Sequence, residues 1–294
     1  MTGLGNIITA MVTPFKPDLS VDWQRVEALA DYLVNNGSEG LVIHGTTGES
    51  PTLTHEEEYE LYRVVKKAVG NKCRIIAGTG SNSTATTIHS TQQAEKIGVD
   101  GVMVVVPYYN KPSQEGLYQH FKTVAQNTAL PVIIYNIPGR TGVNLTPETT
   151  ARLAGIKNII GLKDAAGNLD QTSAASQLCP KDFILWSGDD SLTLPMMSVG
   201  AQGVISVASH IVGPQISEMV KAFLAGETKK AAEIHLRLLP IFKVLFITSN
   251  PAPVKYALEL VGQPVGKPRL PLVEPTENEK AQIKKVLKDL GFVS

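Results

Sequence analysis

Lys163 stands at the end of a short apolar segment, where its amine could act as a nucleophile. Residues 158–163 have the sequence Asn-Ile-Ile-Gly-Leu-Lys, which is typical of a buried β-strand. Lysine is almost never fully buried without a partner, and burial lowers the pKa of its amine. A neutral amine can form a Schiff base with a ketone or an aldehyde. For a lone lysine at a strand end, exposure to solvent is the better interpretation. Whether Lys163 is a nucleophile therefore depends on the other polar clusters of the chain.

Polar clusters follow several other apolar segments of the chain. They are Gly-Thr-Thr-Gly-Glu-Ser at 45–50, Pro-Tyr-Tyr-Asn at 107–110, Tyr-Asn-Ile-Pro-Gly-Arg-Thr at 135–141, Lys-Asp at 163–164 and Ser-Gly-Asp-Asp at 187–190. In a barrel of parallel strands, active-site groups lie on the loops at the carboxyl ends of the strands. One face would therefore gather an amine, two or three phenols, two threonine hydroxyls and a guanidinium.

Eight apolar segments predict eight β-strands to position these groups. They lie at residues 7–13, 41–44, 74–78, 102–106, 132–136, 159–163, 183–187 and 204–207. The segments are continuously apolar, as expected for parallel strands covered on both faces, and amphipathic helices are predicted between them. The sequence therefore predicts an α/β fold, a (β/α)8 TIM barrel. A doubly wound open sheet is the alternative, but Thr13-Pro-Phe-Lys-Pro17 is not the glycine turn that it would need after its first strand.

A recurring phrase supports the αβ repeat. It occurs as Gly37-Ser-Glu-Gly40, Gly98-Val-Asp-Gly101 and Gly200-Ala-Gln-Gly203. In each copy the first glycine suits a left-handed helix end and the second opens a strand. Thr54 with Glu57 forms a capping box at the start of a helix, as does Thr276 with Glu279.

The pattern becomes all-helical after residue 207, with helices predicted at 231–242, 253–261 and 277–290. We therefore expect a catalytic barrel over residues 1–225 and a C-terminal helical appendage over residues 226–294.

The composition of the chain argues against several classes of function. The chain has 294 residues, no net charge and 43% hydrophobic residues, with no tract of lysine or arginine, which argues against a nucleic-acid or membrane surface. No signal peptide or membrane span is predicted, and the two cysteines fit a reducing cytoplasm. The six histidines show no metal-ligand spacing, and Gly78-Thr-Gly80 lacks the third glycine of a dinucleotide site, so we expect neither metal nor cofactor.

The chain resembles the dihydrodipicolinate synthase (4-hydroxy-tetrahydrodipicolinate synthase) group of the pyruvate-dependent class I aldolases, which also include N-acetylneuraminate lyase. The likeness runs from Thr13-Pro-Phe15 through Asn250-Pro-Ala-Pro-Val-Lys255. It depends above all on the combination of Gly45-Thr-Thr-Gly-Glu-Ser50, Tyr135-Asn-Ile-Pro-Gly-Arg-Thr141 and Gly161-Leu-Lys163.

The resemblance implies a lyase of lysine and diaminopimelate biosynthesis. Lys163 would form an imine with pyruvate, and the derived enamine would attack the aldehyde of L-aspartate 4-semialdehyde. Each step moves protons, so an acid/base must stand beside the imine. Tyr135 is the candidate, and because a phenol has a pKa near ~10, it needs a hydrogen-bonded relay. Thr46 and Tyr109 match the family's relay positions.

The resemblance also implies the binding residues and the assembly. Thr47 would hold the pyruvate carboxylate, Ile205 would contact the keto acid through its backbone, and Arg140 would bind the semialdehyde carboxylate. Gly188 would line the second-substrate pocket. In the family the tyrosine at the Tyr109 position enters the neighbouring subunit's site, within a homotetramer built from two tight dimers.

Two other classes remain open. A lyase that cleaves a keto-sugar acid such as N-acetylneuraminate would share the imine chemistry, although Arg140 argues against it. A catalytically silent barrel that binds a small acid or a partner protein is the third hypothesis.

Feedback by lysine is expected to be weak or absent. Lysine-inhibited members of the family bind it at a dimer interface, through positions that here are Ser50, Pro51, His55, Glu58, Asn82, Thr86 and Tyr108. Pro51, Glu58 and Thr86 depart from the family pattern, and Thr86 removes a charged hydrogen-bond partner for the cationic ligand.

Overall fold

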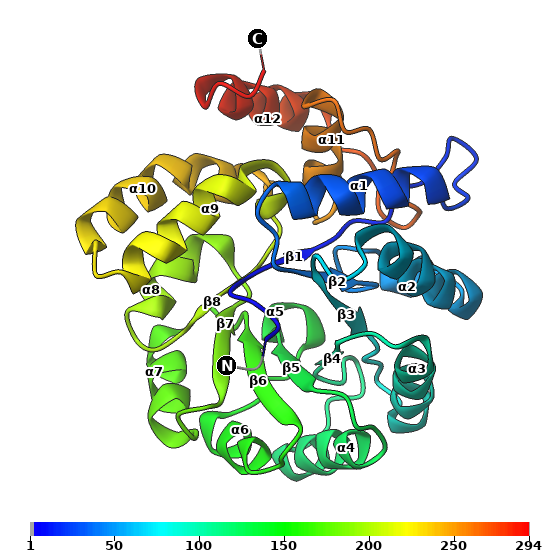
Figure 1. The fold of residues 1–294 in the computed structure, drawn as a ribbon, viewed down its shortest axis with the longest axis vertical. Coiled ribbons are helices and arrows are strands. Elements are labelled where there is room, and N and C mark those ends of the chain that lie inside the picture. The colour runs from blue at the N-terminus through cyan, green and yellow to red at the C-terminus, as the bar shows by residue number, and fades with distance from the viewer. Residues whose placement is uncertain (1–2, 294) are drawn as a thin grey trace.

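Eight parallel strands close into a barrel in the computed structural model, which describes residues 3–293 (Figure 1). The strands are β1 (Ile7–Ala10), β2 (Gly40–Ile43), β3 (Arg74–Gly78), β4 (Gly101–Val105), β5 (Val132–Asn136), β6 (Ile159–Asp164), β7 (Ile184–Ser187) and β8 (Gly203–Ser206). Each strand pairs with its neighbour along the chain, and β8 pairs with β1. The predicted (β/α)8 barrel is confirmed. The first strand is shorter than predicted, because the chain leaves the sheet after Ala10.

Helices form the outer layer of the barrel (Figure 1). They are α1 (Trp23–Asn35), α2 (His55–Val69), α3 (Thr84–Ile97), α4 (Gln114–Gln126), α6 (Pro147–Ala154), α7 (Leu169–Leu178) and α9 (Ser209–Leu224). Short helical turns lie in the loops after β2, β5 and β7, namely η1 (Ser50–Thr52), α5 (Pro138–Thr141), η2 (Asp190–Leu192) and α8 (Thr193–Met197). The sequence analysis did not predict these turns, because they are too short to show a helical period.

The repeated glycines have the roles predicted for them. Gly37, Gly98 and Gly200 have φ angles of +90°, +85° and +113°, a region that glycine tolerates best. The second glycine of each phrase opens β2, β4 or β8. At Gly203 an added Cβ would lie 2.0 Å from the carbonyl oxygen of Asn6, so the close approach of β8 to the N-terminal segment requires glycine. Both predicted capping boxes are also present.

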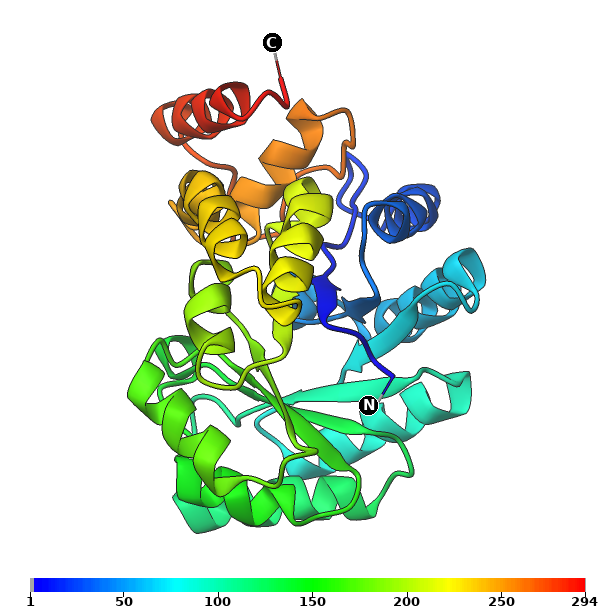
Figure 2. The ribbon, with the colours of Figure 1, turned by 60° about the vertical axis from the view of Figure 1, so that its left-hand side comes forward.

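Three helices follow the barrel and confirm the predicted helical C-terminus. They are α10 (Thr228–Val244), α11 (Ala252–Leu260) and α12 (Glu277–Asp289). Figures 1 and 2 show α11 and α12 beyond α9 and α10, on the side of the molecule where α1 lies. The division into 1–225 and 226–294 stays our proposal, and it would fall in the turn between α9 and α10.

Apolar side chains fill the inside of the barrel, so it is a packed core rather than a channel. The buried residues there include Ile8, Val42, Ile76, Met103, Ile133, Trp186 and Ile205. A larger core lies between the strands and the surrounding helices. Polar groups that perform chemistry are therefore confined to the end of the barrel.

Candidate active site

Lys163 and Tyr135 lie side by side at the carboxyl ends of two neighbouring strands. Tyr135 on β5 pairs directly with Lys163 on β6 in the parallel register. The Lys163 amine lies 4.1 Å from the centroid of the Tyr135 ring, and both residues are 5% exposed. The fold therefore brings together the residues that the sequence analysis assigned to the imine and to proton transfer.

The environment of Lys163 lowers the pKa of its amine and so increases the neutral fraction. The pKa of its amine is lowered from 10.5 to about 8, chiefly because burial penalises the charged state. The positive charge of Arg140 adds to this shift, whereas the carboxylate of Asp190 opposes it. With such a pKa, about a tenth of the amine is neutral at pH 7, which suits a nucleophile.

Asp190 is a site residue to which the sequence analysis gave no role. Its carboxylate accepts hydrogen bonds from the backbone N–H groups of Val207 (3.1 Å) and Ala208 (2.9 Å), and from the Ser206 hydroxyl. Burial raises the pKa of Asp190, while these hydrogen bonds lower it. The signal was present in the Ser-Gly-Asp-Asp cluster after β7, but the local pattern does not tell that Asp190 acts on the lysine charge while Asp189 accepts hydrogen bonds from Ser191.

Tyr135 has a neutral phenol that can donate or accept a proton through a hydrogen bond. Burial raises the pKa of Tyr135 to about 12, although Arg140 and a hydrogen bond with Thr46 lower it. Thr46 is thus the relay residue of the same chain that acts on the Tyr135 pKa, and the relay itself stays a prediction.

Thr47 and Arg140 are connected through a residue of the C-terminal segment. The amide Nδ2 of Asn250 donates a hydrogen bond to the Thr47 hydroxyl at 2.9 Å. The Arg140 guanidinium donates a long hydrogen bond of 3.5 Å to the backbone carbonyl of Asn250. The sequence analysis quoted Asn250 only as the start of a motif, because nothing in the local pattern indicates a contact across some 200 residues.

The loop that carries Thr46 and Thr47 is anchored by a buried ion pair. Glu49 adopts a left-handed φ of +59°, and its carboxylate lies 2.6 Å from the amine of Lys255 on α11. The two side chains are 0% and 2% exposed. The Thr13 hydroxyl donates a second anchoring hydrogen bond of 2.6 Å to the carbonyl of Gly48.

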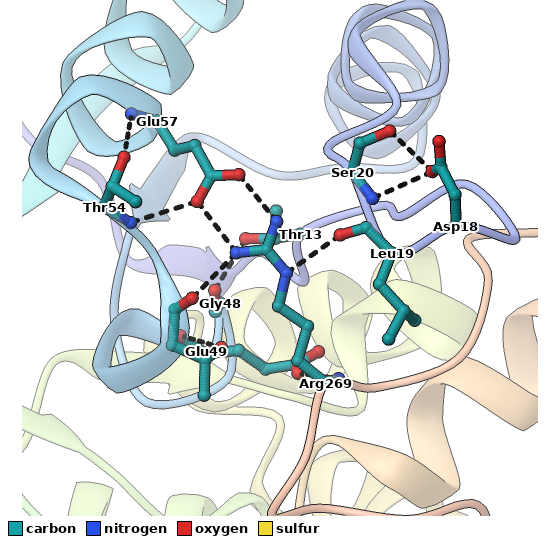
Figure 3. A network of polar contacts seen from close by, with 10 residues as sticks. Thr13, Asp18, Leu19, Ser20, Gly48, Glu49, Thr54, Glu57 and Arg269 are labelled. Carbon is teal, nitrogen blue, oxygen red and sulfur yellow. Dashed lines mark hydrogen bonds and ion pairs between the residues drawn. The ribbon is translucent and has the colours of Figure 1, made fainter.

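Arg269 joins the same loop to the start of α2 (Figure 3). Its backbone N–H donates to Glu49 at 2.8 Å, and its guanidinium binds both carboxylate oxygens of Glu57 at 2.6 and 2.8 Å. The guanidinium also donates to the carbonyl oxygens of Leu19 and Thr52. Glu57 is the capping residue of α2, so one arginine of the appendage ties three barrel segments together.

Gly188 and Ile205 lie close to the reactive pair. A Cβ added at Gly188 would lie 3.2 Å from Cε of Lys163 and 2.8 Å from Cβ of Ala165, so a larger residue would crowd the lysine. Ile205 on β8 is 1% exposed and belongs to the same apolar cluster inside the barrel as Tyr135.

Tyr109 does not join this site within one chain. Its side chain is 88% exposed, so it is not packed against Tyr135 or Thr46. Its φ of +73° is uncommon for a residue with a side chain.

A cavity of about 340 Å³ is lined both by active-site residues and by positions that match the lysine site of inhibited family members. Its lining includes Thr46 and Arg140 from the site, together with Ser50, Pro51, His55, Glu58, Thr86 and Tyr108. Glu58 is 2% exposed and accepts hydrogen bonds from Tyr62 (3.0 Å) and His55 (2.9 Å). Its carboxylate is therefore already engaged.

Two further features are absent from residues 3–293. No group of three or more histidine, cysteine, aspartate or glutamate side chains there is arranged to hold a metal ion. In the same range, no helix is both long and apolar enough to span a bilayer.

A buried lysine at the end of a barrel strand, beside a tyrosine, defines a Schiff-base aldolase type of site. The chain belongs to the Dihydrodipicolinate synthetase family, whose model matches residues 3–290. It is 57% identical to the 4-hydroxy-tetrahydrodipicolinate synthase of Moorella thermoacetica, over 98% of this chain and 99% of that protein.

Solved structures agree with this assignment. A dihydrodipicolinate synthase from Cyanidioschyzon merolae with lysine bound is 49% identical, with a TM-score of 0.97 over 99% of both chains. A dihydrodipicolinate synthase from Bacillus anthracis is also 49% identical, with a TM-score of 0.96 over 98% of this chain and 99% of that one.

Proposed function

We propose that this chain is a lyase that condenses pyruvate with L-aspartate 4-semialdehyde to give 4-hydroxy-tetrahydrodipicolinate. One observation carries the proposal: the amine of Lys163 is buried beside the Tyr135 ring, and its pKa is about 8. A family match over residues 3–290 supports the choice of reaction.

The chemistry starts at the Lys163 amine, which attacks the keto carbon of pyruvate and expels water to form an imine. Removal of a methyl proton then gives an enamine, whose carbon attacks the aldehyde of the second substrate. Finally the amino group of the condensed substrate attacks the imine carbon, which closes the ring and releases Lys163. Tyr135 carries protons in these steps, with Thr46 and Tyr109 as the relay, because a phenol of pKa about 12 needs hydrogen-bonded partners at neutral pH.

Four residues hold the substrates in this proposal. Thr47 binds the pyruvate carboxylate, and the backbone of Ile205 contacts the keto acid. Arg140 binds the semialdehyde carboxylate, since its planar fork suits two-point carboxylate binding. Gly188 lines the pocket of the second substrate, where it leaves room beside Lys163.

The assembly and location are parts of the same proposal. Tyr109 enters the site of a neighbouring subunit, which its 88% exposure supports, and the active form is a homotetramer of two tight dimers. A cytoplasmic location is supported by the two cysteines, both of which are free thiols.

Borohydride trapping tests the chemistry. Incubation with pyruvate and borohydride should add a reduced pyruvate adduct at Lys163, which peptide mass analysis would detect. Product formation should require L-aspartate 4-semialdehyde, and N-acetylneuraminate should not be cleaved. An untouched Lys163 would instead indicate a silent barrel, and cleavage of the sugar acid without synthase activity would indicate the related lyase.

A further inference from the structure

Asn250 occupies a central position between the two proposed substrate-binding groups. It lies in the segment between α10 and α11, is 5% exposed, and contacts the loop after β2 and the turn after β5. Its amide nitrogen is committed to the Thr47 hydroxyl, and its backbone carbonyl lies 3.5 Å from Nη2 of Arg140. One residue of the appendage therefore lies beside both binding groups.

The position of Asn250 is held by the rest of its segment. Lys255 follows little more than one helical turn later, and its ion pair with Glu49 joins α11 to the same loop that carries Thr47. The amine of Lys255 also lies 4.2 Å from the centroid of the Phe15 ring. The start of α11 is therefore fixed against two barrel segments, the loop after β2 and the segment after β1, and Asn250 lies just before that helix.

The remaining polar atom of this amide has no partner. Oδ1 of Asn250 is buried and accepts no hydrogen bond from any residue within 3–293. A buried acceptor without a donor costs free energy, so such an atom in a substrate site indicates a donor that arrives with the ligand.

The chemistry of the substrates identifies that donor. Pyruvate offers only acceptor oxygens. L-Aspartate 4-semialdehyde has one donor group, the ammonium on the carbon that also carries the carboxylate. When Arg140 holds that carboxylate, the ammonium must lie close to the guanidinium, whose Nη2 is 3.5 Å from the backbone carbonyl of Asn250.

We propose that Asn250 determines specificity for the amino aldehyde, with Oδ1 accepting a hydrogen bond from the substrate ammonium group. The inference depends on the proposed function and names a further binding residue for it. Recognition of the ammonium would favour the amino acid aldehyde over aldehyde acids of the same length that lack the amine.

The test compares two aldehydes that differ only in the amino group. In Asn250→Ala, the KM for L-aspartate 4-semialdehyde should rise about ten- to hundredfold, as for the loss of a hydrogen bond to a charged group. The inhibition constant of succinate semialdehyde should stay within about twofold. An equal weakening of both aldehydes would mean that Asn250 only positions Arg140, and no change in either would also overturn the proposal.

A second variant and a matched control complete the design. Asn250→Asp keeps an acceptor oxygen in nearly the same shape, so it should retain the preference for the amino aldehyde, and loss of that preference would contradict the proposal. Asn158→Ala removes a distant asparagine whose amide donates to Ala125, Thr128 and Leu130, and it should leave the ratio of the two constants unchanged.

Trapping separates this inference from the proposed function. At saturating pyruvate, borohydride should still modify Lys163 in Asn250→Ala. A wild-type protein that is not modified would refute the function itself, whereas a modified protein with unaltered aldehyde preference would refute only the role of Asn250.

Discussion

At the residue scale, burial rather than a charged partner makes Lys163 reactive. The amine loses hydration at the strand end, Arg140 repels its proton, and Asp190 only partly offsets both effects. With a pKa of about 8, most of the Lys163 amine is protonated near neutral pH, and the smaller neutral fraction is available to react.

This pKa predicts how imine formation depends on pH. Only the neutral amine attacks the keto carbon, so the rate of borohydride-trapped pyruvate incorporation should rise from pH 7 through about 8 and level off about one pH unit above. Mass analysis of quenched samples at each pH would measure the rate. A flat profile over this range would mean that the amine is not the titrating group, and Lys163→Arg should give no adduct at any pH.

A second residue prediction concerns the phenol of Tyr135. Tyr135→Phe removes the acid/base but keeps the ring beside Lys163, so kcat should fall about 10²- to 10⁴-fold while the fold is retained. Steady-state assays and circular dichroism would check both parts. Tyr118→Phe on α4 is a suitable control, because that ring packs against Arg152 on α6 in the outer layer, and its variant should keep full activity. A Tyr135→Phe enzyme with normal kcat would remove Tyr135 from the relay.

At the element scale, the C-terminal segment anchors the loop that carries Thr46 and Thr47. Glu49 has a left-handed backbone, and its buried carboxylate pairs with Lys255. The same carboxylate accepts a hydrogen bond from the backbone N–H of Arg269, whose contacts are drawn in Figure 3. The C-terminal helical appendage therefore contacts and positions a loop of the candidate site. Isolated residues 1–225 would lack these contacts.

The buried ion pair predicts a large stability effect. Lys255→Met leaves the Glu49 carboxylate buried without its partner, so unfolding free energy should fall by about 3–5 kcal/mol. Urea denaturation would measure the change. As a control, Lys230→Met breaks a pair with Glu218 in which both side chains are about half exposed, and it should cost about 0–1 kcal/mol. Equal losses in the two variants would contradict the anchoring role.

At the scale of the whole molecule, one chain leaves the proposed relay incomplete. Tyr109 is 88% exposed and lies outside the site of its own subunit. A neighbouring subunit would supply it in the proposed assembly, so catalysis and association would be coupled.

Mixing two inactive variants tests this coupling. Lys163→Ala and Tyr109→Phe subunits should each be nearly inactive, because one lacks the nucleophile and the other the relay phenol. Mixed assemblies should recover part of the activity, since some sites then contain an intact lysine and a partner's intact tyrosine. Recovery would be measured after co-refolding, and its absence in assemblies shown to be mixed would argue that each subunit works alone.

A prediction about the whole molecule also concerns feedback by lysine. The initial rate should be unchanged at millimolar lysine, because Thr86 carries no charge and Glu58 is engaged by Tyr62 and His55. The related Cyanidioschyzon merolae protein is described with lysine bound, so the assay is informative. Strong inhibition would show that the cavity still binds lysine despite the departures at Pro51, Glu58 and Thr86.

The sequence alone determined the barrel and most of the candidate site, because these follow from local patterns. Continuous apolar segments indicate parallel strands, and the glycines at 37, 98 and 200 mark helix ends by their own conformational freedom. Since carboxyl ends of barrel strands meet at one face, the position of Lys163 at a strand end already predicted its neighbours.

Only the tertiary structure decided which side chains from distant segments meet. The contacts Thr47–Asn250, Glu49–Lys255 and Arg269–Glu57 join residues more than 200 positions apart. No local period encodes such a contact, because it depends on how α11 and the following loop pack over the end of the barrel. Likewise, only the structure decided that Asp190 acts on the charge of Lys163, since the neighbouring Asp189 carboxylate is engaged by Ser191 within its own turn.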